Sequence, residues 1–360
     1  MIEIPVSLGP RSYRILVGAG LLGRAGAELA RLKVGRRVAL VTDPAILSLH
    51  GDAVTRSLGD AGFDVTTVLL PEGERAKTLE VAASTWDRFL EAGLDRSSTV
   101  VALGGGAVGD LAGFAAATYM RGVNVVQVPT TLLAQVDASS GGKTAIDHPR
   151  AKNLIGAFHQ PRLVIADIAA LLTLPEREYC SGMAEVIKHG IVLDAAYFAE
   201  VERDAAALRA REPAALERIV AGSCRLKASV VERDEQEAEL RHVLNYGHTI
   251  GHAIEAVTGY QRFAHGEAVA LGIAAEAGIA ERLGLAKPGV RARQISALEA
   301  LGLPVSGVGE IPERVIEALS RDKKSKDGRV PFILAPEIGT FRLVYDVPRP
   351  TILDALADLG

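Results

Sequence analysis

The sequence predicts two parts of different character: an α/β half built on a mainly parallel sheet, then a mainly α-helical half. In residues 1–170, short β-branched runs alternate with helical stretches of roughly 10–20 residues, which is typical of parallel strands covered by helices. From about 175 onward Ala, Leu, Glu and Arg dominate with helical periodicity. Because proline disfavours helix in the residue before it, Leu174-Pro175 marks the boundary, and we expect domains at 1–174 and 175–360.

The expected strands of the first half are β-branched runs that end at turns. A hairpin of strands 2–6 and 14–17 around Gly9-Pro10 comes first. Further strands are expected at 37–43, 64–70, 98–103, 123–128 and 163–166. In the second half, helices are expected at 177–210, 213–233, 245–258 and 266–284, and short strands at 330–334 and 340–344.

Bulk properties exclude several classes of protein. The 360-residue chain has a net charge of −4 and a pI near 6.1, which argues against nucleic acid as its main partner. No apolar run reaches roughly 18 residues, so no membrane span is expected. The N-terminus lacks a basic start followed by an apolar run, so no signal peptide is expected. We interpret Cys180 and Cys224 as reduced thiols of a cytoplasmic enzyme, because they have neither disulfide nor metal-ligand spacing.

A glycine-rich turn, GGGAVGD at 104–110, directly follows the expected strand 98–103. Its Gly-x-Gly-x-x-Gly spacing before an apolar helix indicates a Rossmann-like dinucleotide site, because glycines let backbone amides approach a pyrophosphate at the helix N-terminus. The next strand ends in Thr130-Thr131 and not in an acid, so Asp43 or Glu74 is the better ribose candidate. A tight turn without a ligand is the alternative.

Histidines cluster in the second half of the chain. His248 and His252 are four residues apart, so one helical face would carry both rings, and His265 follows. Upstream, Glu185 lies in an otherwise apolar helical stretch. One carboxylate plus imidazoles, with a position left open, is how a catalytic divalent metal such as zinc is held. Hydrogen-bonded or exposed side chains are the alternative, but helix-weakening glycines adjoin these histidines and indicate close approach of backbone or ligand: Gly247, Gly251 and Gly266.

Together and in order, these and other motifs resemble those of one family, the 3-dehydroquinate synthases of the sugar phosphate cyclase superfamily. The resemblance extends over roughly residues 1–345, and the joint order is far more specific than any one motif. The motifs are PEGERAK at 71–77, GGGAVGD at 104–110, PTTLLAQVDAS at 129–139, GGKTA at 141–145, KNLIG at 152–156, GMAEVIK at 182–188, LNYGH at 244–248, HGE at 265–267 and DKK at 322–324.

The resemblance implies a dehydroquinate synthase-like fold and a cytoplasmic, homodimeric lyase of the shikimate pathway to chorismate and the aromatic amino acids. Its substrate would be a phosphorylated sugar acid, 3-deoxy-D-arabino-heptulosonate 7-phosphate. With NAD and one divalent metal, Zn2+ or Co2+, such an enzyme transiently oxidises a hydroxyl, eliminates phosphate, returns the hydride and closes 3-dehydroquinate by an aldol step. Neither nucleic acid nor a membrane is implied as a partner.

Individual site residues follow from the same resemblance. It makes Glu185, His248 and His265 the metal ligands and leaves His252 facing the substrate as a proton carrier. Catalytic roles fall on His252, Glu237, Asn245, Lys143 and Lys188. Substrate contacts fall on Arg121 (reaching the neighbouring subunit's site), Asp137, Lys152, Asn153, Lys227, Arg241 and either Lys324 or Lys323. NAD contacts fall on Glu72, Gly73, Glu74, Lys77, Gly105, Gly106, Ala107, Val108, Gly109, Asp110, Thr130, Thr131, Lys143, Lys152 and Thr173, with Asp43 added as a ribose candidate.

Three positions depart from the family pattern. Asp147 stands where Asn is usual, Ser140 where Val is common, and Ala151 where Gly often occurs. We expect these positions in a loop that also carries predicted substrate and NAD contacts. The departures affect the fine geometry of that loop but remove no ligand or charged contact.

Other functions predict different chemistry. A metal- and NAD-dependent polyol or alcohol dehydrogenase would transfer hydride permanently, and its neutral substrate would offer nothing to the predicted basic side chains. A sister sugar-phosphate cyclase would take a substrate without a carboxylate. Arg241 is the residue that discriminates between the two substrates, because guanidinium is the best bidentate partner of a carboxylate. A structural or regulatory protein would neither release phosphate nor hold a metal.

Overall fold

The computed structural model describes residues 1–309, 311–319 and 330–360, which form two compact units. The first unit comprises Met1–Leu174 and Leu216–Glu232, and the second comprises Pro175–Ala215 and Arg233–Gly360. One segment differs from the expected division. Leu216–Glu232, most of helix α9 (Pro213–Arg233), belongs to the first unit and not to the second, and it carries Lys227.

Polar contacts with distant parts of the chain attach this α9 segment to the first unit. The amino group of Met1 lies 2.9 Å from Oε1 of Glu217. The carboxylate of Glu232 accepts the N–H of Ser7 at 2.6 Å. Because the partners lie more than 200 residues apart in sequence, helical periodicity alone gives no sign of where this helix packs.

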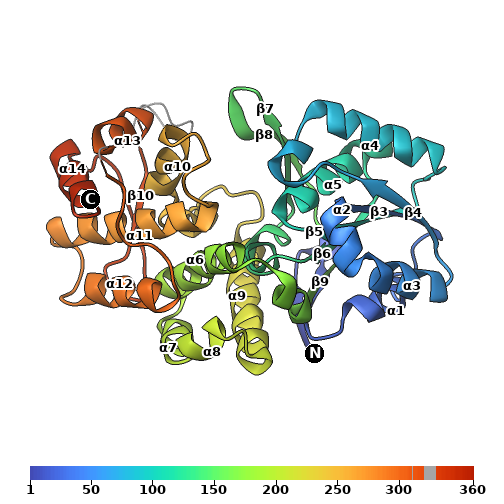
Figure 1. The fold of residues 1–360 in the computed structure, drawn as a ribbon, viewed down its shortest axis with the longest axis horizontal. Helices are drawn as coiled ribbons and strands as arrows, with labels where there is room; N and C mark the ends of the chain where they lie inside the picture. The colour runs from blue at the N-terminus through green and yellow to red at the C-terminus, as the bar shows by residue number, and fades with distance from the viewer. Residues whose placement is uncertain (310, 320–329) are drawn as a thin grey trace. The chain divides into compact units, whose positions relative to one another are not determined.

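The first unit is built on a seven-stranded sheet in the order β1-β2-β9-β6-β5-β3-β4 (Figure 1). Neighbouring strands are parallel except β1 and β2, which are antiparallel. The strands are β1 (Ile2–Val6), β2 (Tyr13–Gly18), β9 (Leu163–Asp167), β6 (Asn124–Pro129), β5 (Thr99–Gly104), β3 (Arg37–Thr42) and β4 (Asp64–Leu69). The predicted α/β architecture with a mainly parallel sheet is confirmed.

Both faces of this sheet are covered by helices, because successive side chains of a strand point to opposite faces. On strand β3, Ala39 and Val41 pack in one core with helices α4 (Leu79–Glu91) and α5 (Gly106–Thr118). Val38 and Leu40 pack in another core with helices α1 (Ala25–Ala30) and α3 (Asp52–Asp60). Figure 1 shows these two helix pairs on opposite sides of the strands. Burial on both faces explains why the inner strands β3, β5 and β6 are nearly continuous apolar runs.

A second small sheet occupies the segment that we expected to be a loop. Strands β7 (Lys143–His148) and β8 (Ala151–Phe158) form an antiparallel hairpin, so that expectation is wrong. The strands approach closely at Gly156, where a Cβ atom would lie 2.2 Å from the carbonyl oxygen of Thr144. The hairpin was not predicted because β8 is mostly exposed and lacks an alternating apolar pattern.

The second unit is mainly helical, as predicted. Its helices are α6 (Glu176–Leu193), α7 (Ala195–Arg203), α8 (Ala205–Arg209), α10 (His248–Val257), α11 (His265–Arg282), α12 (Val290–Ala300), α13 (Pro312–Leu319) and α14 (Arg349–Ala357). The 3-10 helix η8 (Leu240–Asn245) precedes α10, and strands β10 (Phe332–Leu334) and β11 (Arg342–Val344) form a hairpin. Within the described ranges, no helix combines the length and the apolar character needed to cross a membrane.

Two helix boundaries differ from the expected ones, each because of a capping residue. The expected helix 177–210 is divided into α6, α7 and α8. The break between α6 and α7 lies at Asp194, whose carboxylate accepts the N–H groups of Ala196 and Tyr197 and so begins α7. Helix α10 begins at His248 and not at 245, because Gly247 has a φ of +76° and forms its N-cap.

Candidate functional site

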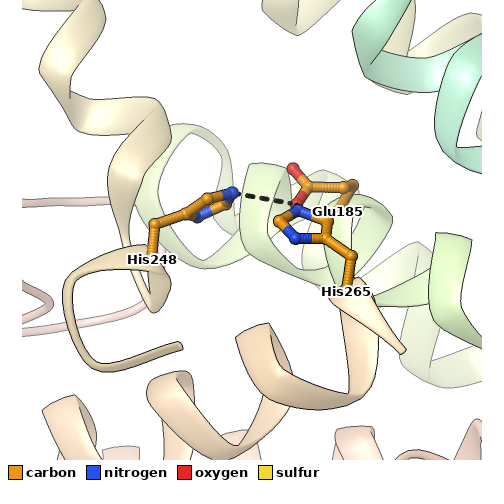
Figure 2. Close-up of side chains that lie close together, drawn as sticks. All are labelled: Glu185, His248 and His265. Carbon is orange, nitrogen blue, oxygen red and sulfur yellow. Dashed lines mark ion pairs between the residues drawn. The ribbon is translucent and has the colours of Figure 1, made fainter. Parts of the chain in front are cut away.

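Three helices of the second unit bring Glu185, His248 and His265 together. Glu185 lies in the middle of α6, while His248 and His265 are the first residues of α10 and α11. Oε1 of Glu185 is 3.4 Å from Nε2 of His248 and 3.9 Å from Nε2 of His265. Figure 2 shows the three side chains turned toward one another, with the dashed line joining His248 to Glu185. One ligand atom from each residue lies within 4.8 Å of the others.

The chemistry of this cluster fits a divalent cation. Glu185 is 1% exposed, and its Oε1 accepts no hydrogen bond from the described residues. Its other carboxylate oxygen contacts Nζ of Lys188, one turn further along α6. A buried carboxylate oxygen without a hydrogen bond is unfavourable unless a cation approaches it. Two imidazole nitrogens and one carboxylate oxygen are a donor set that suits Zn2+ or Co2+.

Hydrogen bonds to the far ring nitrogens orient both histidines. Nδ1 of His248 lies 3.1 Å from the carbonyl oxygen of Tyr246, and Nδ1 of His265 lies 3.3 Å from Oε2 of Glu255. With Nδ1 as the donor, each Nε2 is left with its lone pair toward Glu185. Burial lowers the pKa of His265, but its hydrogen bond to Glu255 and the charges of Glu255 and Glu185 outweigh burial and raise the pKa above 6.5.

Close packing of backbone fixes the starts of the two histidine-bearing helices. The fully buried carboxylate of Glu276 accepts the N–H of Gly247 at 2.7 Å, at the N-terminus of α10. A Cβ atom at Gly266 would lie 1.8 Å from the carbonyl oxygen of Ser181 on α6. The close backbone approach expected from the glycines beside the histidines is therefore present. The sequence did not predict that Glu276 accepts the backbone N–H of Gly247.

The two other predicted catalytic residues of these helices lie one turn after the ligand candidates. His252 follows His248 on α10, with ring centroids 5.1 Å apart, and its ring is 5.9 Å from that of His265. Lys188 follows Glu185 on α6 and is 1% exposed. Both side chains therefore border the Glu185 cluster without forming part of it.

The predicted residues Glu237, Arg241 and Asn245 lie on the segment between α9 and α10, which is organised by a carboxylate that sequence reasoning missed. Asp234 accepts the N–H groups of Ala238, Glu239 and Arg241 at 2.8–2.9 Å. Burial raises the pKa of Asp234, but these backbone hydrogen bonds outweigh it and lower the pKa to about 2. Arg241 is only 2% exposed, so the turn that Asp234 organises fixes the backbone of a residue whose guanidinium is buried.

In the first unit, the predicted NAD contacts gather at the carboxyl ends of four adjacent parallel strands. Asp43 follows β3, Glu72–Lys77 follows β4, Gly105–Asp110 follows β5, and Thr130-Thr131 follows β6. Gly105 is the N-cap of α5, so the backbone N–H groups of the helix start there. This edge of a parallel sheet is where dinucleotides bind in doubly wound folds.

A polar cluster joins that sheet edge to the β7–β8 hairpin. Lys77 donates to Asp110 at 2.8 Å and to Oδ1 of Asn153. Lys152 lies 3.3 Å from Glu74. Burial lowers the pKa of Lys77, but the charges of Asp110 and the other nearby carboxylates outweigh burial, so the pKa is raised. Burial raises the pKa of Asp110, and the positive charge of Lys77 offsets only part of this increase. Asp147, one of the departures, accepts the N–H of Asn153 at 2.7 Å and so helps to set that turn.

Other predicted residues are placed separately. Lys227 on α9 lies 2.6 Å from Asp137, so these two substrate candidates form an ion pair within the first unit. Thr173 lies 3.0 Å from His50. Arg121 is exposed and has a φ of +67°. Lys143 is exposed at the start of β7, and Lys323 and Lys324 lie outside the described residues.

Models of protein families match most of the chain in two consecutive stretches. Residues 67–181 match the N-terminal model of 3-dehydroquinate synthase, and residues 182–325 match the C-terminal model. The chain belongs to the 3-dehydroquinate synthase family. It is 52% identical to the 3-dehydroquinate synthase of Pelotomaculum thermopropionicum over 99% of this chain and 96% of that one. It is also 52% identical to that of Geobacter metallireducens, over 96% of each.

Solved structures of sugar cyclases share the fold of this 3-dehydroquinate synthase family member. One is 2-epi-5-epi-valiolone synthase of Streptomyces hygroscopicus with NAD+ and Zn2+ bound, at 29% identity over 98% of each chain and a TM-score of 0.89. Another is 2-deoxy-scyllo-inosose synthase with carbaglucose-6-phosphate, NAD+ and Co2+, at 26% identity over 100% of each chain and a TM-score of 0.89. A probable glycerol dehydrogenase of Sinorhizobium meliloti, 18% identical with a TM-score of 0.68, shares the fold alone. The expected dehydroquinate synthase-like fold is confirmed.

Proposed function

We propose that this protein is the 3-dehydroquinate synthase of the shikimate pathway in the cytoplasm. It converts 3-deoxy-D-arabino-heptulosonate 7-phosphate into 3-dehydroquinate and inorganic phosphate. The observation that carries the proposal is the meeting of the buried Glu185 and His248 with the partly buried His265, in a chain 52% identical to named 3-dehydroquinate synthases over nearly its whole length. The same donor set without such relatives would indicate a metal site but no particular reaction.

The protein takes NAD at the carboxyl edge of its parallel sheet and one Zn2+ or Co2+ at Glu185, His248 and His265. Solved relatives hold NAD+ with either metal, which supports both assignments. When bound, NAD accepts and returns a hydride, and the metal acts as a Lewis acid on substrate hydroxyls. The protein's own residues supply binding, orientation and proton transfer.

Backbone and carboxylate groups of the first unit hold the dinucleotide. The glycine turn at 105–109 presents N–H groups at the start of α5 to the pyrophosphate, where the helix dipole favours negative charge. Asp43 and Glu74 are the acceptors for ribose hydroxyls, and Thr130 and Thr131 line the same sheet edge at the end of β6. Lys77 holds the β7–β8 hairpin to this edge through Asn153 and Asp110.

Proton transfer and substrate orientation fall to residues bordering the Glu185 cluster. His252 accepts and returns protons, because an imidazole is the side chain whose pKa lies closest to neutrality. Glu237, in the turn that Asp234 organises, and Asn245, at the end of η8, orient substrate hydroxyls. Lys143 and Lys188 supply positive charge during phosphate elimination.

Basic side chains recognise the two anionic groups of the substrate. Arg241 binds the substrate carboxylate through two hydrogen bonds. Because Arg241 is buried, its attraction to a carboxylate is stronger than it would be in water, which favours a substrate that carries one. Asp137, Lys152, Asn153 and Lys227 are further substrate contacts, and Asp137 also orients Lys227 through their ion pair. The exposed Arg121 extends to a neighbouring subunit of a homodimer.

An assay of inorganic phosphate tests this function. Purified protein with NAD and the heptulosonate phosphate is expected to release one phosphate per 3-dehydroquinate formed, with no net accumulation of NADH. A chelator should abolish the release, and added Zn2+ or Co2+ should restore it. Stoichiometric NADH would indicate a polyol dehydrogenase instead, and turnover only of a heptulose phosphate without a carboxylate would indicate a sister cyclase.

A further inference from the structure

Glu255 lies directly behind one of the two metal-binding histidines and has no role in the function proposed above. We propose that Glu255 is a positioning residue that fixes the tautomer and orientation of His265, so that the two histidines of the metal centre are supported unequally. His248 is held by a neutral backbone carbonyl and His265 by a carboxylate. The inference rests on the proposed metal site.

The geometry assigns this role through the far nitrogen of the His265 ring. Glu255 lies two turns after His248 on α10 and is 7% exposed. Its Oε1 and Oε2 lie 3.4 and 3.3 Å from Nδ1 of His265, while Nε2 of the same ring is on the side of Glu185, at 3.9 Å. Because a carboxylate only accepts, Nδ1 donates and Nε2 keeps the lone pair that binds a cation.

The contrast with His248 gives Glu255 a specific effect. Nδ1 of His248 donates to the carbonyl oxygen of Tyr246, which carries only a partial charge. A full negative charge behind His265 makes that ring the more basic ligand, and such outer carboxylates typically change metal affinity by about 10- to 100-fold. The hydrogen bond from His265 to Glu255 also links the first residue of α11 to α10. It therefore orients the His265 ring at the point where the two helices meet.

A second cation is the competing interpretation of the same side chains. His252, Glu255 and His265 also offer one ligand atom each within 4.8 Å. Nδ1 of His265 cannot donate a hydrogen bond to Glu255 and bind a cation at once. The positioning role therefore predicts one bound ion per chain, and two would overturn it.

Metal binding by the whole protein tests the role without relying on activity. The variants are Glu255→Ala, which removes the acceptor, and Glu255→Gln, which keeps an acceptor oxygen but not the charge. Glu281→Gln on α11 is the matched control, because Glu281 pairs with Arg291 about 24 Å along the helix from His265. The dissociation constant for Zn2+ is measured by competition with a chromophoric chelator at fixed pH, and the visible spectrum of the Co2+ form reports the ligand geometry.

We expect Glu255→Ala to weaken Zn2+ binding about 10- to 100-fold, Glu255→Gln to fall between Ala and wild type, and Glu281→Gln to match wild type. The Co2+ absorption bands should shift in both Glu255 variants. If Glu255→Gln, which is close in shape to glutamate, folds with unchanged Zn2+ affinity and an unchanged Co2+ spectrum, the proposal is wrong.

Two further readouts separate this inference from its alternatives. Thermal unfolding of the metal-free proteins identifies a merely structural role: a lower melting temperature with a wild-type Co2+ spectrum in the bound fraction would contradict positioning. Wild-type protein that binds no Zn2+ would refute the proposed metal site itself. If wild type binds one Zn2+ and both Glu255 variants bind it with the same dissociation constant, only the role of Glu255 is refuted.

Discussion

Glu185 is the residue on which the proposed metal centre depends most, because both histidines approach the same oxygen atom of its carboxylate. Oε1 is 3.4 Å from His248 and 3.9 Å from His265, and it is buried. The neighbouring Lys188 contacts the other oxygen, so the two oxygens of one carboxylate have different partners. Removal of its charge leaves two neutral imidazoles beside Lys188, whose positive charge then repels a cation without compensation.

Glu185→Gln is therefore expected to lower phosphate release by about 100- to 1,000-fold and to leave the purified protein without its metal. Metal content by elemental analysis and the phosphate assay check this. Glu178→Gln, on the exposed face of the same helix, is the matched control and should retain both metal and activity. A Glu185→Gln protein with full metal content would contradict the assignment.

For single residues, the sequence indicates which side chains could bind a metal better than it indicates which of them lie together in the fold. The spacing of His248 and His252 favours that pair as ligands, whereas the structure groups His248 with Glu185 and His265. Only the resemblance to the family indicated that set. Asp234, Glu255 and Glu276 were not predicted, because each acts through a hydrogen bond whose geometry depends on the folded backbone.

Among the elements, the contact between α6 and α11 decides how far Glu185 lies from His265. Gly266 makes this contact possible, since a Cβ atom there would lie 1.8 Å from the carbonyl oxygen of Ser181. The N–H of Gly266 also donates to Oγ of Ser181 at 2.9 Å. A larger residue must move α11 away from α6, and the metal ligands move with them.

Gly266→Ala is expected to lower the free energy of unfolding by about 1–3 kcal/mol and to weaken metal binding, because overpacking displaces the helix. Urea denaturation and chelator competition measure the two effects. Gly278→Ala, later in α11, is the control: the nearest atom to its Cβ would be the end of the Arg282 side chain at 3.2 Å. That variant should be neutral or more stable by up to about 1 kcal/mol. Equal behaviour of the two variants would disprove the packing argument.

The turn organised by Asp234 predicts a dependence of stability on pH. Its pKa of about 2 lies below the ordinary 3.8, so the carboxylate stabilises the folded chain above about pH 4 and loses this effect as the pH falls toward 2. Asp234→Asn should differ most from wild type at neutral pH and progressively less in acid. Urea denaturation at several pH values checks this, with the exposed Asp87→Asn on α4 as control. A difference that grows in acid would contradict the account.

Asp234→Asn should also lower kcat/KM about tenfold at neutral pH, because Glu237 and Arg241 lose the backbone order that places them. Steady-state phosphate release measures this ratio. Unchanged kcat/KM with lowered stability would limit Asp234 to a structural role.

Elements with a strong period were predictable, and elements fixed by distant contacts were not. The seven strands of the large sheet follow from apolar runs that end at turns. The β7–β8 hairpin was missed because its pairing, Thr144 with Ala157 and Ala145 with Gly156, shows no apolar alternation. Helix α12 was also missed, since its sequence, VRARQISALEA, has no clear apolar face.

For the whole molecule, the chain crosses between its two units more often than the sequence indicates. The predicted boundary at Leu174-Pro175 coincides with a junction of the units, but the chain returns to the first unit over Leu216–Glu232. Lys227 thereby pairs with Asp137 of the first unit. No local pattern reports such a return, because it depends on contacts such as that of Met1 with Glu217.

The proposed homodimer with Arg121 acting in the neighbouring subunit predicts complementation between inactive variants. Arg121→Ala and Glu185→Gln should each be inactive alone. After mixing and exchange of subunits, half of the dimers are mixed and each has one intact site, so about a quarter of wild-type activity should return. Light scattering measures whether the protein is a dimer in solution. No recovery in demonstrably mixed dimers would contradict action across subunits.

The most direct test of the account is an anomalous-scattering map of crystals grown with Zn2+ and NAD, recorded at the zinc absorption edge. We expect one strong peak per chain, about 2.0–2.2 Å from a carboxylate oxygen of Glu185 and from Nε2 of both His248 and His265. A map with no peak among these three side chains, or with the only strong peak elsewhere, would contradict the metal centre on which the proposed function depends.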